Sequence, residues 1–153
     1  MIKKDLSKVT GMVNVVIRDD SGKIKQEFTV SNLVVDTGLD FIASRMKDTA
    51  EAAMSHMAVG TDNTAATAAD TALGTELARQ ALTSTIVSSN SISYIATFAP
   101  GVGDGALTEA GLFNDPTAGT MLCRTVFAVI NKDAADSMTV TWSVTISDRK
   151  SVV

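Results

Sequence analysis

The sequence predicts a mainly β protein, an antiparallel β-sandwich of the jelly-roll type with a single α-helix. Short segments rich in β-branched and aromatic residues recur along the chain, about seven to nine in number, with polar or glycine-containing turns between them. One segment alone has its apolar residues at helical spacing. Strands and helices do not alternate along the chain, as they would in an open α/β sheet.

Length and composition limit the class of protein further. The chain has 153 residues, of which 45% are hydrophobic and 20% are charged, which suits one folded domain and neither a disordered segment nor a membrane span. We expect an N-terminal arm or opening edge strand over residues 1–10 and a single sandwich domain over residues 11–153. The net charge of −4 argues against nucleic acid as a ligand, and no secretory signal is evident at the N-terminus.

The first strong β signal is a hairpin. The β-branched segment 12–18 and the segment 23–30, in which Ile24, Phe28 and Val30 are apolar, flank Asp19-Asp20-Ser21-Gly22, a typical turn sequence. A calcium loop on Asp19 and Asp20 is the alternative. An EF-hand needs further oxygen ligands and a glutamate at its twelfth position, which this sequence lacks, so the turn is favoured.

The C-terminal half predicts a second hairpin and a well-patterned strand. Segments 82–88 and 92–98 alternate in polarity on either side of a Ser-Asn-Ser turn. In 139–147, apolar residues alternate with serines and threonines, which predicts one buried face and one hydroxyl-rich face. The apolar members are Val140, Trp142, Val144 and Ile146, and shorter strands are predicted over 57–60, 107–113 and 121–130.

The helix is predicted over residues 38–54. Thr37 lies where an N-cap belongs, and Asp40 lies where a capping box has its acidic residue. Apolar residues at spacings of three and four predict one stripe facing the core, although such a stripe can also bind a partner. Its members are Leu39, Ile42, Ala43, Met46, Ala50, Ala53 and Met54.

A long surface loop is predicted over residues 61–75, because small and polar residues follow one another there without an apolar period. Contact with another chain is the function we expect for it. The candidate contact residues are Asp62, Asn63, Thr64, Thr67 and Asp70, together with Lys3, Lys4 and Lys8 of the arm. Cation binding by Asp62 and Asp70 is the alternative to solvated carboxylates.

The sequence is poor in residue types that carry out catalysis. It contains one histidine, His56, and one cysteine, Cys123, so it can form neither an intramolecular disulfide nor a two-histidine metal site. We expect His56 to be packed or at a helix end, and Cys123 to be a small buried hydrophobe. No catalytic, cofactor-binding or metal-binding residues are predicted, and the chain is not expected to be an enzyme.

Four charged residues lie among apolar neighbours and are predicted to form structural ion pairs. They are Glu76, Arg79, Glu109 and Arg124. The alternative is that Glu76 and Glu109 share a cleft and act as general acid and base. The sequence offers no aromatic platform for a sugar near them, so the structural interpretation is favoured.

Four segments together resemble a known family. They are NLVVDTGLDFIASRM (32–46), MAVGTDNTAATAADTALGTELARQAL (57–82), EAGLFND (109–115), and GTMLCRTVF through KDAADSMTVTWSVTIS (119–147). In this order they resemble small virion structural proteins of tailed bacteriophages and prophages. The resemblance covers roughly residues 30–147 and implies a non-enzymatic part of a phage particle, on the head or on the tail. It provides no active-site residues.

The function expected from this resemblance is that of a capsid cement or decoration protein, which stabilises the shell through inter-subunit contacts. A tail-side component (tail fibre, baseplate or neck protein) is the alternative, and a small carbohydrate-binding or hydrolytic module is a more remote one. The expected partners are the major capsid protein or tail proteins of the same virion and further copies of this chain in a dimer or trimer. No cofactor, nucleic acid or membrane is expected, and the location is the virion after synthesis in the host bacterial cytoplasm.

Overall fold

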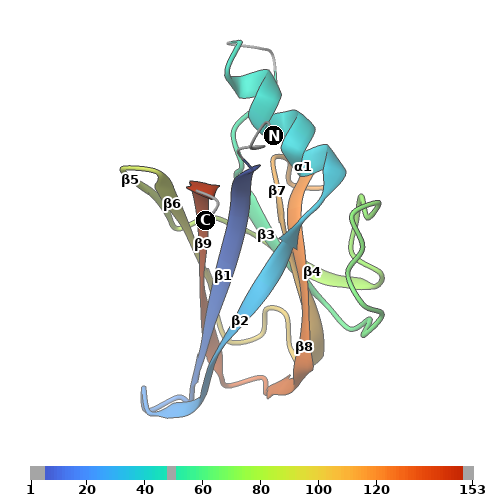
Figure 1. Cartoon of the computed structure of the whole chain (residues 1–153). Helices are drawn as coiled ribbons and strands as arrows, with labels where there is room; N and C mark the ends of the chain where they lie inside the picture. Colours follow the sequence, from blue (N-terminus) through green and yellow to red (C-terminus); the bar gives the residue numbers. More distant parts are fainter. Residues whose placement is uncertain (1–5, 48–50, 150–153) are drawn as a thin grey trace.

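Nine strands form one curled antiparallel sheet in the computed structural model, which describes residues 6–47 and 51–149 (Figure 1). The elements in chain order are β1 (Leu6–Arg18), β2 (Ile24–Val34), α1 (Asp36–Arg45), β3 (His56–Gly60), β4 (Glu76–Ala81), β5 (Ser84–Ser88), β6 (Ser91–Phe98), β7 (Gly105–Phe113), β8 (Met121–Lys132) and β9 (Ser137–Arg149). The order across the sheet is β4-β3-β7-β8-β2-β1-β9-β6-β5. The predicted class, mainly β and antiparallel with one helix, is confirmed for the described residues.

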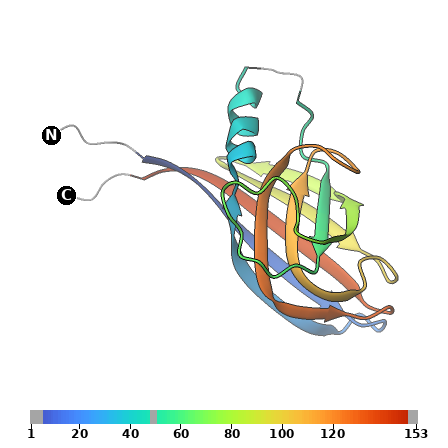
Figure 2. The ribbon, with the colours of Figure 1, turned by 90° about the vertical axis from the view of Figure 1, so that its right-hand side faces the viewer.

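The sheet is continuous because β2 belongs to both of its halves. β2 pairs with β1 as far as Asn32, which lies opposite Gly11, and its last residues, Leu33 and Val34, pair with β8. The sheet curls so that its two halves face each other across the core (Figure 2). The two separate sheets of a jelly roll are not what the strand order describes, so this finer part of the prediction is not confirmed.

The core is filled by side chains that alternate along the strands. Val13, Val15 and Ile17 of β1 face inward, and the adjacent β9 contributes a fully buried Trp142. The opposite half contributes buried residues of β3, β7 and β8, namely Met57, Val59, Leu107, Leu112 and Ile130. The alternation predicted for 139–147 is confirmed, except that Ile146 is half exposed, because it lies beyond the last residue of β9 that pairs with β6.

The first described residues belong to a central strand. β1 pairs with β9 along its whole length, from Leu6 opposite Arg149 to Arg18 opposite Ser137, and with β2 from Gly11 onward. Residues 6–10 are therefore strand, as in the edge-strand alternative of the prediction, and they pair with β9 but not with β2. Lys8 is exposed on this strand, whereas Lys3 and Lys4 lie outside the described residues.

Both predicted hairpins are confirmed, as are the strands expected at 57–60, 107–113 and 121–130. In the first turn, Oδ1 of Asp19 accepts hydrogen bonds from the backbone N–H and hydroxyl of Ser21 and from the N–H of Lys23, at 2.6–3.0 Å. This local pattern is an Asx turn. Gly22 has a φ of +86°, which a side chain would disfavour.

The helix exists but differs from the prediction in its bounds and in its buried face. It begins at Asp36, before the predicted start, and residues 51–54 are not helical. Val35 occupies the N-cap position without a side-chain bond, and the Thr37 hydroxyl donates to the Met121 carbonyl of β8 at 3.0 Å. Thr37 therefore contacts β8 and does not cap the helix. The predicted N-cap at Thr37 is wrong, and so is the capping box between Thr37 and Asp40.

Gly38 and Phe41 form the buried face of α1. A Cβ on Gly38 would collide with the backbone of Leu122, so the helix packs against β8 through its own main chain. From the predicted stripe, Leu39 is exposed and Met46 is 88% exposed. The prediction is borne out at Ile42, which packs against the core, and Met54 is buried although it lies outside the helix; Ala50 lies outside the described residues. The rest of the stripe was wrong because the closest approach to β8 falls at a glycine, which an apolar pattern does not reveal.

Candidate functional site

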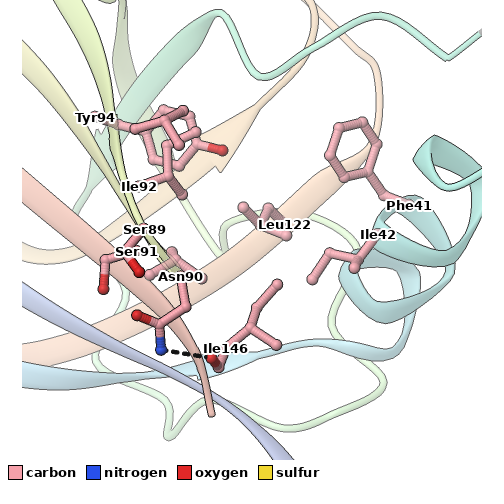
Figure 3. A pocket seen from close by; sticks show the side chains of 11 residues that line it. Phe41, Ile42, Ser89, Asn90, Ser91, Ile92, Tyr94, Leu122 and Ile146 are labelled. Atoms are coloured by element: carbon pink, nitrogen blue, oxygen red, sulfur yellow. Dashed lines mark hydrogen bonds between the residues drawn. The ribbon is translucent and has the colours of Figure 1, made fainter.

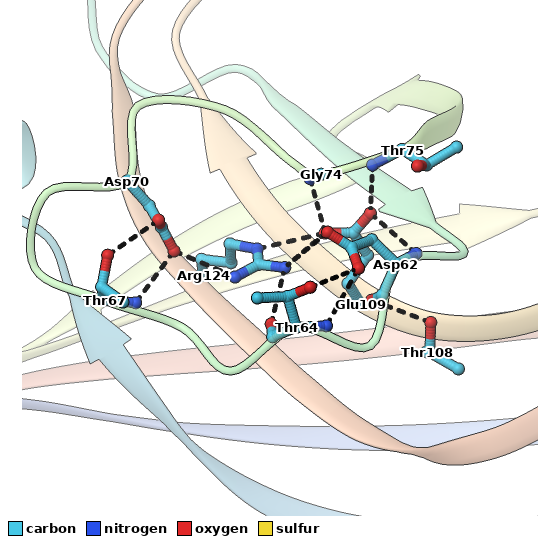
Figure 4. Close-up of polar contacts among 9 residues, drawn as sticks. All are labelled: Asp62, Thr64, Thr67, Asp70, Gly74, Thr75, Thr108, Glu109 and Arg124. Carbon is cyan, nitrogen blue, oxygen red and sulfur yellow. Dashed lines mark hydrogen bonds and ion pairs between the residues drawn. The ribbon is translucent and has the colours of Figure 1, made fainter.

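A buried ion pair connects β7 and β8 (Figure 4). The Nη2 and Nε atoms of Arg124 donate to Oε2 of Glu109 at 2.9 and 3.1 Å. Glu109 is 0% exposed and Arg124 is 3% exposed. At such burial an unpaired charge would be strongly destabilising, so each residue requires the other.

Glu109 also closes the loop over residues 61–75. Its Oε1 accepts from the backbone N–H of Asp62 and Thr75, and its Oε2 accepts from that of Gly74, at 2.8–3.2 Å. Thr61 and Thr75 are joined directly by a backbone bond of 3.0 Å. One carboxylate thus holds both ends of the loop against the sheet.

Arg124 holds the middle of the same loop. Its Nη1 donates to Oδ2 of Asp70 at 2.9 Å, and its Nη2 donates to the Thr64 carbonyl at 3.1 Å and lies 3.9 Å from Oδ2 of Asp62. The backbone N–H and hydroxyl of Thr64 donate to Asp62, and those of Thr67 donate to Asp70. The carboxylates of Asp62 and Asp70 are therefore hydrogen-bonded to other residues of this chain.

These bonds favour the ionised carboxylates. Bonds from Thr64 and the nearby Arg124 charge lower the pKa of Asp62 below its ordinary value. Burial acts to raise the pKa of Asp70, but bonds from Thr67 and Arg124 outweigh it, and this pKa is lowered as well. The predicted contact residues therefore divide into inward-facing Asp62 and Asp70, and exposed Asn63, Thr64 and Thr67.

The loop also covers a second, smaller apolar cluster. Leu73 is buried there with Phe113 of β7, and the other members are Val35, Ala58 and Met121. The main core lies on the opposite face of β7. β7 is buried continuously from Leu107 to Phe113 because the main core covers one of its faces and the loop covers the other.

Arg79 performs a similar role at the edge strand β4. Its guanidinium donates to both carboxylate oxygens of Glu76, at 2.6 and 3.1 Å, and to the carbonyls of Asp115 and Ala118, at 2.9 and 2.8 Å. It also lies 3.8 Å from the centre of the Phe113 ring, a cation–π contact. The structure thus pairs Glu76 with Arg79 and Glu109 with Arg124.

The geometry does not suit an acid–base pair at Glu76 and Glu109. A general acid or base must reach the proton that it transfers, and Glu109 is fully buried with both oxygens bonded. His56 is half-buried with Nδ1 2.8 Å from the Ser55 hydroxyl. Cys123 is fully buried, and burial raises the pKa of its thiol well above the ordinary value, as expected for a packed hydrophobe.

Two further observations concern the described part of the chain. Among residues 6–47 and 51–149, no group of three or more histidine, cysteine, aspartate or glutamate side chains is arranged to hold a metal ion. The one helix described there is too short to cross a membrane.

One buried cation was missed in the sequence. Lys132, at the end of β8, is 1% exposed, and its Nζ donates to Oδ1 of Asp104 at 2.6 Å and to the Ala99 carbonyl at 3.1 Å. It holds the turn between β6 and β7. A lysine that ends a strand beside a polar turn normally points to solvent, so the sequence carried no signal for this contact.

An apolar groove between α1 and the β6–β9 part of the sheet was also missed (Figure 3). Its volume is about 200 Å³, and Phe41 and Ile42 of α1 face Ile92 and Tyr94 of β6 across it. Burial raises the pKa of Tyr94 to about 12. The Asn90 amide at its rim donates to the Ile146 carbonyl at 2.8 Å. The groove is mainly apolar, and its polar lining consists of the hydroxyls of Ser89, Ser91 and Tyr94 and the amide of Asn90.

The outer faces of β6 and β9 form a hydroxyl-rich surface, here called the hydroxyl face. It comprises Ser91, Ser93 and Thr97 of β6 and Thr139, Thr141, Ser143 and Thr145 of β9. Neighbouring hydroxyls bond across the strands, Ser91 to Thr145 at 2.7 Å and Ser93 to Ser143 at 3.1 Å. Ile95 of β6 lies on the same face between Ser93 and Thr97. Neither 80–103 nor 137–147 contains a charged residue, so this face is uncharged and mostly polar.

Comparison with known proteins returned no match to a family model, to a curated protein or to a solved structure.

Proposed function

We propose that this chain is a non-enzymatic structural protein of a tailed-bacteriophage virion, and specifically a capsid cement or decoration protein. The observation that carries the proposal is the hydroxyl face, an uncharged and mostly polar surface on β9 and β6, the two strands that precede the edge strand β5 in the sheet. Such a surface forms hydrogen bonds to a protein shell without the cost of desolvating charges. The four segments within residues 30–147 that resemble virion structural proteins, in the same order along the chain, are the reason for placing it in a virion.

The buried charges support the same conclusion. Glu109, Arg124, Arg79 and Lys132 are each bonded to neighbouring loops, so they stabilise a rigid scaffold. Rigidity lowers the entropy lost when the exposed residues of the 61–75 loop contact a partner. Many such modest contacts, repeated around a particle, stabilise a shell strongly because the chain binds only the assembled form.

The first test is the number of copies per particle, measured by quantitative mass spectrometry of purified virions against the major capsid protein. A cement protein should be present at a simple ratio to the capsid subunit. A small number of copies, as expected for a neck, baseplate or fibre, would favour the tail-side alternative. Absence from the particle would contradict both.

A second test places the interface. Thr97→Arg introduces a large charge on the hydroxyl face, and Ala106→Arg introduces the same charge at an exposed position of β7. We expect Thr97→Arg to weaken binding to particles stripped of this protein at least tenfold, about 1.4 kcal/mol, and Ala106→Arg to bind like the unmodified chain. Equal binding by both variants would remove the hydroxyl face from the interface.

A further inference from the structure

The strand β5 leaves one edge of the sheet open. It is last in the strand order, and within the described chain its outer side has no partner strand. All five of its residues are exposed, including Ile86 at 55% and Val87 at 71%. An exposed and apolar strand edge is a template for pairing with another strand.

The opposite edge of the sheet is protected in ways that β5 is not. β4 carries the charged residues Glu76 and Arg79, its pairing with β3 is interrupted by a bulge, and Arg79 holds the loop with Asp115 beside it. Charges and bulges are the usual protection of an edge strand. β5 contains no charge and no proline, and it lies within the uncharged segment 80–103.

The direction of the free backbone groups follows from the hairpin register. The Thr83 N–H donates to the Ile95 carbonyl, whereas the Asn90 carbonyl accepts from Ile146. Odd-numbered residues of β6 therefore turn their backbone groups toward β5, and even-numbered residues turn theirs toward β9. Because Ile86 lies opposite Ser93, Ile86 bonds within the hairpin, and Thr85 and Val87 direct their N–H and C=O groups outward.

We propose that β5 pairs with β5 of a second copy of this chain, antiparallel, about a two-fold axis at Ile86. The sequence Ser84-Thr85-Ile86-Val87-Ser88 suits this register, since serine then faces serine and Ile86 faces its own copy. Thr85 and Val87 each exchange both backbone bonds with the other copy's Val87 and Thr85. The contact is isologous and closes as a dimer.

Charge and side-chain packing favour this occupant over a different protein. Each copy carries a net charge of −4, but β5 and its neighbour β6 contain no charged residue, which limits repulsion between two copies paired there. The nearby Arg45 of α1 lines a hollow with Thr85 and donates to the Glu51 carbonyl at 2.8 Å. Val87 lines the mouth of the apolar groove, and pairing places a second strand beside it. The inference does not rest on the proposed function, because it concerns the purified chain alone.

The test uses opposite charges at the two-fold axis. Ile86→Lys and Ile86→Glu each place like charges opposite one another in a dimer, whereas a mixture of the two variants places lysine opposite glutamate. Val129→Lys is the matched control. Val129 is 56% exposed, much like Ile86, but it lies on β8, which has β7 and β2 as its neighbours and is far from the β5 edge in the strand order. Mass is measured by sedimentation velocity over a range of concentrations.

We expect the unmodified chain and Val129→Lys to form a dimer with twice the monomer mass of 16.0 kDa. Each Ile86 variant alone should associate at least tenfold more weakly, and mixing the two should restore the dimer. Val87→Pro removes an outward N–H without removing a bond of the β5–β6 hairpin, and it should also be monomeric. If Trp142 fluorescence shows that the Ile86 variants do not fold, the mass of Val87→Pro decides between a dimer and a monomer.

Three outcomes would overturn the inference. The unmodified chain could be a monomer at every concentration, it could be a trimer, or the folded Ile86 and Val87 variants could dimerise as tightly as the unmodified chain. None of these outcomes involves capsids, so a failure here is distinguishable from a failure of the proposed function.

Discussion

The buried pair between Glu109 and Arg124 leads to the most specific prediction about stability. Arg124→Met keeps a long unbranched side chain but removes four hydrogen bonds, two to Glu109, one to Asp70 and one to the Thr64 carbonyl. The Glu109 carboxylate then stays buried and keeps only its three backbone N–H donors.

The expected loss follows from this count. Removing one partner of a buried ion pair costs about 3–5 kcal/mol, and the three remaining N–H donors place this case near the lower value, about 3 kcal/mol. A domain of this kind has about 5–15 kcal/mol of total stability. With a urea slope of about 2 kcal/mol/M, the unfolding midpoint should fall by roughly 1.5 M.

The assay is urea unfolding followed by the fluorescence of Trp142, the only tryptophan of the chain and fully buried. Hydrogen exchange over 61–75 gives a second reading and should become faster in Arg124→Met. Arg18→Met is the control, because Arg18 is exposed and donates one bond to the Gly22 carbonyl at 3.1 Å; its effect should stay within about 0.5 kcal/mol. A loss below about 1 kcal/mol with unchanged exchange in the loop would refute the reasoning, since Leu73 and the backbone bonds would then suffice to hold it.

The remaining predictions concern the helix, the thiol and acid stability. Gly38→Ala should destabilise the protein by at least about 1 kcal/mol in urea unfolding, although alanine favours helices, because its Cβ would meet the Leu122 backbone; a more stable variant would contradict the close approach of α1 to β8. Cys123 should react with an aromatic disulfide reagent at least about a hundredfold more slowly in the native protein than in urea, because its thiol is buried and its pKa is raised; equal rates would mean that the strand opens readily. The pKa is lowered in the folded state for Asp19, Asp62, Asp70, Asp115 and Asp136. The folded chain therefore binds fewer protons than the unfolded one, so the stability these groups contribute is full above their ordinary pKa of 3.8 and is lost as the pH falls through the lowered values. The urea midpoint should accordingly decrease below about pH 4, and a midpoint that stays constant to pH 2 would contradict the carboxylate bonds.

Most of the strands were predictable because their signals are local, whereas β4 (Glu76–Ala81) was not predicted. Alternation of apolar and polar residues in 139–147, and turn residues such as Asp19 and Gly22, depend on neighbours within a few positions. The helix bounds were not predictable in the same way. Its start is determined by contact with Met121 and Leu122 of β8, which are far away in the sequence.

The charged contacts also differ in how far the sequence predicted them. Glu109 and Arg124 were recognisable as members of structural ion pairs, because charged residues embedded in apolar segments need partners when buried, but only the structure showed that they pair with each other. Asp62 and Asp70 appeared to belong to a solvated loop, and only the folded chain brings them within reach of Arg124. Lys132 had no sequence signal for its contact with Asp104.

By itself, the sequence determined the mainly β class, the antiparallel hairpins and the presence of one helix, since these follow from residue patterns over a few positions. The tertiary structure decided the curled single sheet, the attachment of the 61–75 loop, the apolar groove and the open edge at β5. The reason is physical: these features depend on which distant segments share a face or an edge, and β2 alone makes the two halves one sheet by passing from β1 to β8 within residues 32–34.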